Sequence, residues 1–262
     1  MRLPMTLTAV LASPRLRAVG LILAGLAAWE VAARSAAGPI TVVPWPSAIV
    51  GGLLAKPWIY LDGAQPTLIS AALGLALGTA FAWGMAVSFA RSRKVEESLY
   101  NLVVILHGLP FLAIIPLLVI WMGNGYAPKI TIAALATFFP VLVNATRGLK
   151  AADNAGLDLF RLLNASWTQE LLKLRVPLCL PYAFAGLKIA APNAILGATI
   201  AEWIGSRYGL GAMILNAMFN FDVITLWATM LVCTSVALAA FGLFVLLERL
   251  TVGRWAQPEP EQ

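Results

Sequence analysis

Charged residues are scarce in this chain. Lys and Arg account for 18 of its 262 residues and Asp and Glu for 12, so that 11% of the residues are charged, whereas a soluble domain averages about 25%. Hydrophobic residues make up 60% of the chain, and the mean hydropathy is +0.84. A water-soluble protein of this size needs more surface charge to stay dispersed. The composition excludes a disordered chain and an ordinary soluble enzyme, and it predicts a protein embedded in lipid.

Histidine, cysteine and the common catalytic motifs are also scarce. His107 is the single histidine, which excludes a histidine-pair metal site within one chain. Cys179 and Cys233 are the only cysteines, and we interpret both as small apolar residues of the interior. The sequence contains no GxxxxGK[ST], HExxH, CxxC or GxSxG pattern. We therefore expect no catalytic residue, no bound metal or cofactor and no ATP hydrolysis by the chain itself.

Long uncharged runs predict six membrane spans, because about 20 apolar residues cross a bilayer as a helix. We place the spans at roughly 18–36, 67–90, 98–121, 129–147, 181–202 and 223–247. The first run follows Arg15 and Arg17 and therefore also resembles a signal peptide. The further spans behind it favour a retained helix. The predicted fold class is an all-α membrane protein with six transmembrane helices.

Basic residues are distributed unevenly about these spans. With the N-terminus inside, the inner side holds Arg2, Arg15, Arg17, Arg91, Arg93, Lys94, Arg147, Lys150, Arg161, Lys173, Arg175, Arg249 and Arg254. The outer side holds Arg34, Lys56, Lys129 and Arg207, while Lys188 lies in a span near its inner end. Cytoplasmic loops are enriched in Lys and Arg, so we expect both the segment 1–17 and the tail 251–262 in the cytoplasm. The net charge of +6 is then an orientation signal and needs no nucleic acid as partner.

Two outer segments are longer than simple turns. Residues 38–66 contain five prolines, which predict an extended loop; these are Pro39, Pro44, Pro46, Pro57 and Pro66. Residues 203–222 are apolar but interrupted by glycine, so we expect a re-entrant or surface helix there. Such backbone is tolerated where protein or a water-filled cavity covers it.

Small residues predict where helices touch in lipid, since close backbone approach replaces the hydrophobic drive for association. The fifth span has a small residue at every fourth position, namely Gly186, Ala190, Ala194 and Ala198. This face is expected between other helices or at a subunit seam. Gly74 and Gly78 form a GxxxG pair in the second span, a pattern that also arises by chance. Prolines at 110, 116, 140 and 192 are expected to kink their helices, either around a transport pathway or as ordinary tolerated prolines.

Acidic residues are nearly absent from the spans. Glu30 is the clear exception, and Arg34 four residues later predicts a local ion pair. A proton-coupled transporter usually has carboxylates or histidines near mid-membrane. Their scarcity predicts that the energy for any transport comes from another protein.

The inner loop 148–180 is expected to form two short helices. The first spans about Ala155 to Leu163 and ends at Asn164, whose side chain tolerates the left-handed conformation at a helix end. Ser166 with Gln169 forms a capping box that begins the second. Pro177 and Pro181 are expected to end that helix before the fifth span. Apolar residues partly exposed on the first helix indicate a docking surface; they are Leu157, Leu159, Phe160 and Leu163.

The same loop resembles the cytoplasmic signature of binding-protein-dependent ABC importer permeases, E-A-A-x-x-x-G followed by a run ending in L-P. Asp158 stands at the position of the Glu, Leu159 and Phe160 at the two Ala, and Asn164 at the Gly; Pro177 and Leu180-Pro181 match the ending. Further matches over about 18–250 are Trp29-Glu30, Pro44 to Ser47, Gly108 to Pro110, Ile115-Pro116, Phe138 to Pro140, Glu202-Trp203 and Gly209 to Gly211. They resemble the nitrate/sulfonate/taurine/bicarbonate-type permeases, which include importers of pyrimidine precursors and riboflavin.

The resemblance implies a type I ABC importer permease fold in the bacterial inner membrane. It implies three partners: a second permease copy, a cytoplasmic ABC ATPase dimer that binds ATP and Mg, and an extracytoplasmic substrate-binding protein. The implied ATPase-docking residues are Leu157, Asp158, Leu159, Phe160, Arg161, Leu163, Asn164, Ala165 and Ser166. Candidate pathway residues are His107, Pro110, Pro116, Glu202, Trp203, Gly209 and Gly211.

The substrate is less narrowly defined. The resemblance implies a small organic anion of the sulfonate or taurine type, or nitrate. The alternative is a flat vitamin precursor passing outer aromatic residues, which equally fit an interfacial belt; these are Trp203, Tyr208, Phe219, Phe221 and Trp227. A stand-alone secondary transporter or channel is the alternative of another class, and it predicts inverted repeats and midplane charges.

Overall fold

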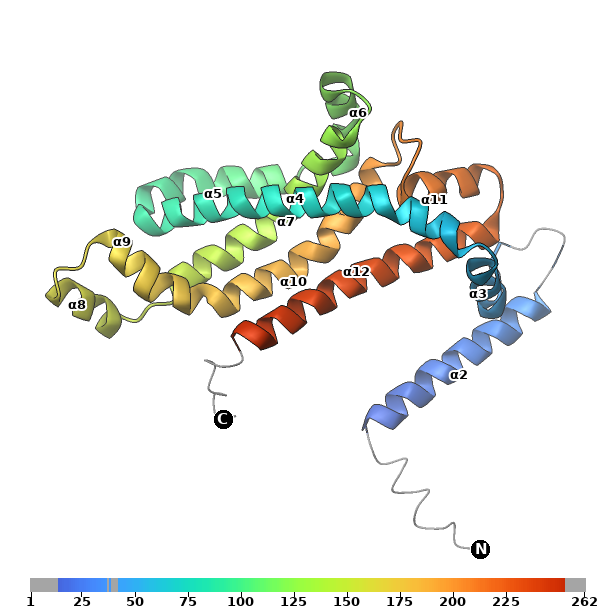
Figure 1. The fold of residues 1–262 in the computed structure, drawn as a ribbon, viewed down its shortest axis with the longest axis horizontal. Coiled ribbons are helices and arrows are strands. Elements are labelled where there is room, and N and C mark those ends of the chain that lie inside the picture. The colour runs from blue at the N-terminus through green and yellow to red at the C-terminus, as the bar shows by residue number, and fades with distance from the viewer. Residues whose placement is uncertain (1–13, 37, 39–41, 253–262) are drawn as a thin grey trace, which may run out of the picture.

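Helices form all the regular structure in the described part of the chain, residues 14–36, 38 and 42–252 of the computed structural model. In chain order they are α2 (Pro14–Ser35), α3 (Pro46–Ala55), α4 (Pro57–Arg91), α5 (Arg93–His107), α6 (Phe111–Met122), α7 (Tyr126–Leu149), α8 (Asn154–Leu162), α9 (Trp167–Glu170), the π-helical turn η1 (Leu171–Arg175), α10 (Val176–Ala201), α11 (Leu210–Phe219) and α12 (Val223–Thr251). Figure 1 shows their arrangement. The all-α fold class is confirmed. Most of the predicted segments 1–17 and 251–262 lies outside the described residues.

Five helical stretches are long and apolar enough to cross a membrane, namely Leu16–Ser35, Pro57–Arg91, Tyr126–Leu149, Trp167–Ala201 and Val223–Thr251. They coincide with the first, second, fourth, fifth and sixth expected spans. The third predicted span, 98–121, does not form a single helix as the other five do. It consists of α5 and α6, which meet at an angle of 93°. Pro110 ends the helical hydrogen bonding after Gly108, since proline has no N–H to donate.

The extended loop predicted for residues 38–66 is wrong over its described C-terminal part. Pro46 and Pro57 begin helices α3 and α4, and Pro66 lies inside α4. A proline in the first helical turn removes an N–H that has no partner there in any case. These prolines therefore start helices, and the helix of the second span begins at Pro57 instead of residue 67.

The second loop helix does not end before the fifth span, contrary to prediction. Trp167–Ala201 forms one continuous helical stretch of 35 residues, which we call the rod. Within it the Val176 N–H donates to the Leu171 carbonyl, five residues back, in η1. Such a π-helical turn admits one extra residue into a helix, and the chain stays helical through Pro177 and Pro181. The predicted loop 148–180 is thus shortened to the segment that precedes Trp167.

Helix α7 packs between α4 and α10. A Cβ at Gly78 would lie 2.1 Å from Thr137 Oγ1, and one at Gly186 would lie 3.3 Å from the Pro140 carbonyl oxygen, so both glycines touch α7. The small face of α10 is buried inside the chain at Ala190, Ala194 and Ala198. The structure therefore favours the reading of this face as buried between helices. Cys179 and Cys233 are free and buried, as predicted.

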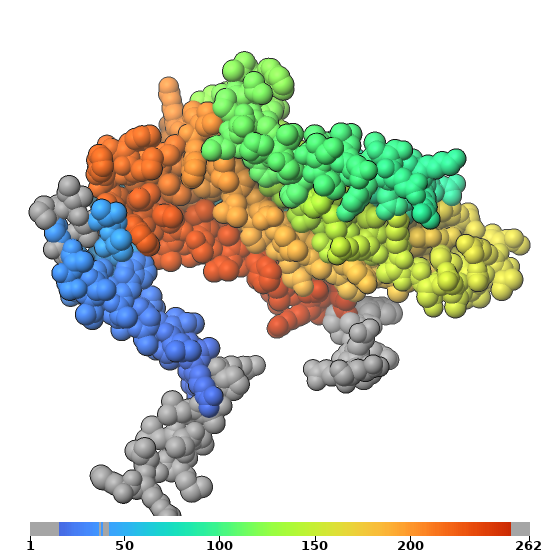
Figure 2. Space-filling model, turned by 180° about the vertical axis from the view of Figure 1, so that it is seen from behind, coloured from blue at the N-terminus to red at the C-terminus, as the bar shows by residue number. Residues whose placement is uncertain are grey.

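The molecule has two functional ends, which lie far apart in Figure 1. The α8 end contains α8, the α4–α5 junction and the end of α7. The α11 end contains α3, the end of α10, α11 and the start of α12. Helix α2 projects from the body as an arm that meets it near α3, as Figure 2 shows from behind. Its apolar surface is largely exposed within a single chain.

Candidate functional site

Local signals position helix α8. The Asp153 side chain accepts a hydrogen bond from the Gly156 N–H at 2.9 Å and so caps its start. Asn164 has a φ of +50°, which confirms the predicted left-handed end. Ser166 and Gln169 form the predicted capping box, with Ser166 N–H donating to Gln169 at 2.8 Å. The chain thus reverses between two well-defined helix ends.

One face of α8 presents leucines to solvent. Leu159, Leu162 and Leu163 are 54%, 81% and 68% exposed, and their spacing of three and four residues places them side by side on one face. We call them the leucine stripe. Of the other predicted docking residues, Leu157 and Phe160 are half-buried. Leu162 was not among the predicted docking residues, although its spacing of three residues from Leu159 is typical of one helix face.

The remaining predicted docking residues are polar or lie at the turn. Asp158 pairs with Arg161 at 2.8 Å on the exposed surface of α8. Ala165, between the helix ends, is half-buried, and its N–H donates to the Phe160 carbonyl at 3.0 Å. This bond closes the end of α8. The turn is therefore ordered by hydrogen bonds of its own backbone.

Polar contacts join the chain segments on either side of α8 to the bundle. Arg175 donates to the Leu149 carbonyl at 2.8 Å and pairs with Glu170 at 2.6 Å. Lys150 pairs with Glu96 at the start of α5. The Arg91 guanidinium lies 5.0 Å from the centre of the Trp167 ring, at the first residue of the rod. The ends of α4 and α7 and the start of α5 are thus joined to the segment around α8.

Glu202 occupies the opposite end of the rod, in a buried polar cluster. Only 1% of the surface of Glu202 is exposed to solvent. The carboxylate accepts hydrogen bonds from the Gly211 N–H at 2.8 Å and from the Thr67 hydroxyl at 2.8 and 2.9 Å. The Thr67 oxygen in turn accepts from the Leu210 N–H at 2.9 Å. We call this arrangement the Glu202 cluster, and it joins α4, α10 and the first residues of α11.

Two glycines permit this cluster. Gly209 has a φ of +123°, and a Cβ there would lie 2.2 Å from the Glu202 carboxyl carbon. A Cβ at Gly211 would lie 2.1 Å from the Thr199 carbonyl oxygen. Any side chain at either position would therefore push α11 away from the carboxylate. The predicted pathway residues Glu202, Gly209 and Gly211 thus come together, but as a packed joint.

The other predicted pathway residues do not join them. The His107 ring stacks on Phe139 with centroids 4.1 Å apart, at the α5–α6 bend. Pro110 and Pro116 are exposed near and on α6. Trp203 is exposed beside the Glu202 cluster. The predicted pathway residues therefore lie in two separate regions, one at the Glu202 cluster and one at the α5–α6 bend and α6.

A polar pocket of about 440 Å³ opens at the α11 end, next to the Glu202 cluster. Lys129 and Arg207 line it, together with Tyr126 and Tyr208. Lys129 is only 8% exposed, and its ammonium group donates to the Ser206 hydroxyl at 2.8 Å. Two cationic side chains flanked by aromatic rings suit a small anion. The sequence indicated Lys129 only as a basic residue at the end of a span, and its place in this pocket was not predicted.

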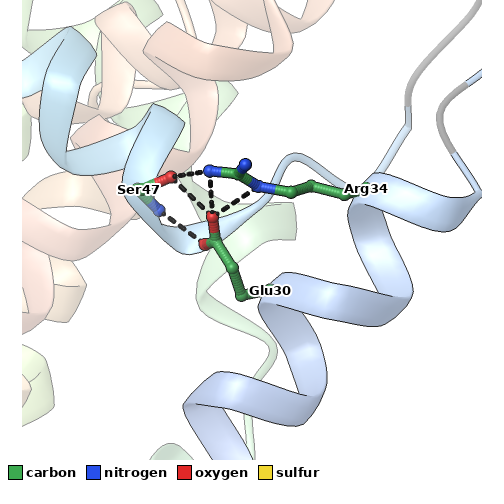
Figure 3. A network of polar contacts seen from close by, with 3 residues as sticks. All are labelled: Glu30, Arg34 and Ser47. Atoms are coloured by element: carbon green, nitrogen blue, oxygen red, sulfur yellow. Dashed lines mark hydrogen bonds and ion pairs between the residues drawn. The ribbon is translucent and has the colours of Figure 1, made fainter.

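Glu30 tethers α2 to α3, as Figure 3 shows. The predicted pair with Arg34 is present, at 2.6 Å. In addition, the Glu30 carboxylate accepts from the Ser47 N–H at 3.0 Å and from its hydroxyl at 2.7 Å. Ser47 lies in the first turn of α3, so Glu30 caps that helix. The negative charge of Glu30 inside the first predicted span is therefore balanced by Arg34 and by the hydrogen bonds from Ser47.

Lys188 of α10 is also paired. Its ammonium group lies 2.8 Å from the Glu248 carboxylate of α12. This pairing offsets the positive charge predicted near the inner end of the fifth span. The two helices are thereby joined on the side towards the α8 end.

Comparison with known proteins defines the family. The profile described as "Binding-protein-dependent transport system inner membrane component" matches residues 74–254. This chain belongs to that family. The permease is similar to a probable ABC transporter permease of Haemophilus influenzae, 35% identical over 81% of this chain and 87% of the relative. It is 30% identical to a formylaminopyrimidine transport permease of Halalkalibacterium halodurans, over 85% and 89% of the two chains. It is 31% identical to a taurine transport permease of Escherichia coli, over 85% and 84%.

Family membership settles the general role. The permease is a multi-pass protein of the bacterial plasma membrane and a component of an ABC importer of the sulfonate/taurine/nitrate type. The family works with an ABC ATPase and a substrate-binding protein. The permease is the membrane-spanning component of such a system, distinct from the ATPase. The match over 74–254 includes α8, the rod, Glu202, Gly209 and Gly211, while Thr67 lies before the matched range.

Proposed function

We propose that this permease imports a small organic anion of the sulfonate or taurine type, driven by an ATPase docked on α8. The leucine stripe supports this assignment most directly. Three leucines more than half exposed on one short helix form an apolar surface that a soluble partner covers. The polar contacts at Arg175 and Lys150 fix the segments on either side of that helix, and through these segments we expect a movement of α8 to reach the bundle.

The α8 end faces the cytoplasm in this proposal. The support is the distribution of charge, since the ends of α4, α7 and α12 and the start of α5 place most basic residues at that end. Both termini are then cytoplasmic, and the polar pocket with Lys129 opens outside. ATP and Mg are bound by the partner ATPase.

The polar pocket supports an anionic substrate. Lys129 and Arg207 line this pocket, and with the pocket on the outer side their positive charge would attract an anion released by an external binding protein. Relatives include an aliphatic sulfonate permease and a taurine permease by name. Others are named for formylaminopyrimidine and riboflavin, and the Tyr126 and Tyr208 rings at the same pocket fit a flat heterocycle as the alternative.

A second copy of the permease completes the pathway in this proposal. The arm α2 and helix α12 leave most of their apolar surface uncovered within one chain. An apolar groove of about 460 Å³ lies between α4, α10 and α12. Native mass spectrometry of the purified permease checks this: two copies per complex are expected, and a single copy in the active complex contradicts it.

Reconstitution tests the function. The permease is co-expressed with an ABC ATPase and a substrate-binding protein from the same organism, purified through a tag on the permease, and placed in proteoliposomes. ATP-dependent uptake of taurine or an alkanesulfonate is expected, with nitrate, riboflavin and formylaminopyrimidine as competing ligands. Uptake of a heterocycle alone would select the alternative substrate. Failure of the ATPase to co-purify, or uptake without ATP, would refute the ATP-driven mechanism.

A further inference from the structure

The rod links the two functional ends of the permease in one element. Its 35 residues span about 50 Å at a rise of 1.5 Å per residue. It begins at Trp167, directly after the turn that follows α8, and it ends at Ala201, directly before Glu202. A displacement at Trp167 would therefore be carried to Glu202 through a continuous helix.

Helix α11 shares a buried apolar cluster with the rod through Leu210, and the Glu202 cluster adds hydrogen bonds at its start. Residues 202–209 form an irregular turn, and Gly205 and Gly209 have positive φ angles there. This turn does not fix the direction of α11 as a continuous helix does. The Glu202 carboxylate instead binds the Gly211 N–H at 2.8 Å, and the negative charge is favourable at a helix N-terminus.

Thr67 makes the cluster a three-way joint. Its hydroxyl donates to Glu202, the residue directly after the rod, and accepts from Leu210 of α11, while its own backbone belongs to α4. Thr67 is distant in the sequence from both partners, with separations of 135 residues from Glu202 and 143 from Leu210. Both carboxylate oxygens of Glu202 and the hydroxyl of Thr67 have hydrogen-bond partners. These bonds are buried, and the low dielectric of the interior strengthens them.

We propose that Glu202 and Thr67 are positioning residues for transport, which make the outer ends of α4, the rod and α11 move as one unit when the ATPase displaces α8. The inference rests on the proposed function, because it requires ATP-driven movement at α8. It adds a role at the outer face: Glu202 and Thr67 set the position of α11 and do not bind the substrate. The polar pocket at Lys129 lies beside this unit, so we expect its shape to change when the unit moves.

A matched pair of variants at Thr67 tests the joint. Thr67→Val keeps the shape of the side chain but removes the hydroxyl, and Thr67→Ser keeps the hydroxyl. Both are made in the full permease–ATPase complex in nanodiscs, with Cys179→Ala, Cys233→Ala and Asn216→Cys as the background. Asn216 is exposed on α11, so the rate of maleimide labelling reports movement there with and without ATP and vanadate.

We expect nucleotide to change the labelling rate in the parent protein and in Thr67→Ser, and this change to be lost in Thr67→Val. The KM for ATP is expected to stay the same in all three proteins, because Thr67 lies at the far end of the rod from the docked ATPase. A purely structural role would lower assembly and melting temperature without this selective loss. An undiminished nucleotide response in Thr67→Val would overturn the proposal. A parent protein without any response would instead refute the ATP-driven mechanism.

A covalent tether gives a second test that does not depend on weakening the fold. A Cβ at Gly63 of α4 would contact the Met213 side chain of α11, so Gly63→Cys and Met213→Cys place two thiols together. If α4 and α11 move as one unit, oxidation of this pair in the parent background leaves the nucleotide response of position 216 intact. Loss of the response on oxidation, restored by a reductant, would show that α4 and α11 must separate and would overturn the proposal.

Discussion

Replacement of Leu162 by Ala should weaken docking of the ATPase while leaving the permease folded. Leu162 is 81% exposed on α8, so its removal costs little within the chain itself. The change removes three carbon atoms at about 0.8 kcal/mol each. If docking covers the exposed part of the side chain, the loss is about 2 kcal/mol, or about 30-fold in the dissociation constant.

The assay is titration of the purified ATPase onto the permease in nanodiscs, followed by a surface-binding signal. Leu54→Ala is the matched control, because Leu54 is 71% exposed and lies in α3 at the opposite end. Leu54→Ala should bind the ATPase as the parent protein does. Equal affinity of the Leu162→Ala, Leu54→Ala and parent proteins would refute the assignment of the leucine stripe as the docking surface.

Two further predictions concern coupling and packing. Phe160→Asp places a carboxylate on the half-buried side of α8 and is expected to uncouple ATP hydrolysis from uptake; uptake per ATP hydrolysed measures this, and a wild-type ratio would contradict it. Gly78→Ala puts a Cβ 2.5 Å from the Ala134 carbonyl oxygen and should lower the melting temperature of the permease, with a cost of about 1–3 kcal/mol. Gly84→Ala in the same helix has open space around the new Cβ and should leave that temperature unchanged or slightly raised, so equal melting of the two variants would argue against close α4–α7 packing.

Short-range signals in the sequence predicted the structure well. Asn164 and Ser166 act on backbone groups within a few residues, so their effects on the end of α8 and the start of the rod follow from local chemistry. The same holds for Glu30 and Arg34, one helical turn apart. The GxxxG pair at Gly74 also packs as the pattern suggests, because its Cβ would lie 2.4 Å from that of Ala133.

Prolines and distant partners were the sources of error. Pro46 and Pro57 were interpreted as loop residues, yet proline in the first turn is compatible with a helix. Pro177 was expected to end a helix, but η1 just before it keeps the chain helical. The partnership of Thr67 with Glu202 depends on how α4 meets the end of α10. No sequence periodicity reports such a contact, and the same applies to Ser47 and Glu30.

The extra residue held by the π-helical turn has a rotational consequence. Each residue of an α-helix turns the chain by about 100°, so one residue more or fewer between Trp167 and Pro177 would swing the leucine stripe by roughly that angle about the rod axis. The turn at Leu171–Arg175 therefore sets the azimuth of the leucine stripe relative to Glu202. An insertion or deletion there would leave both ends intact and aim the leucines in a different direction.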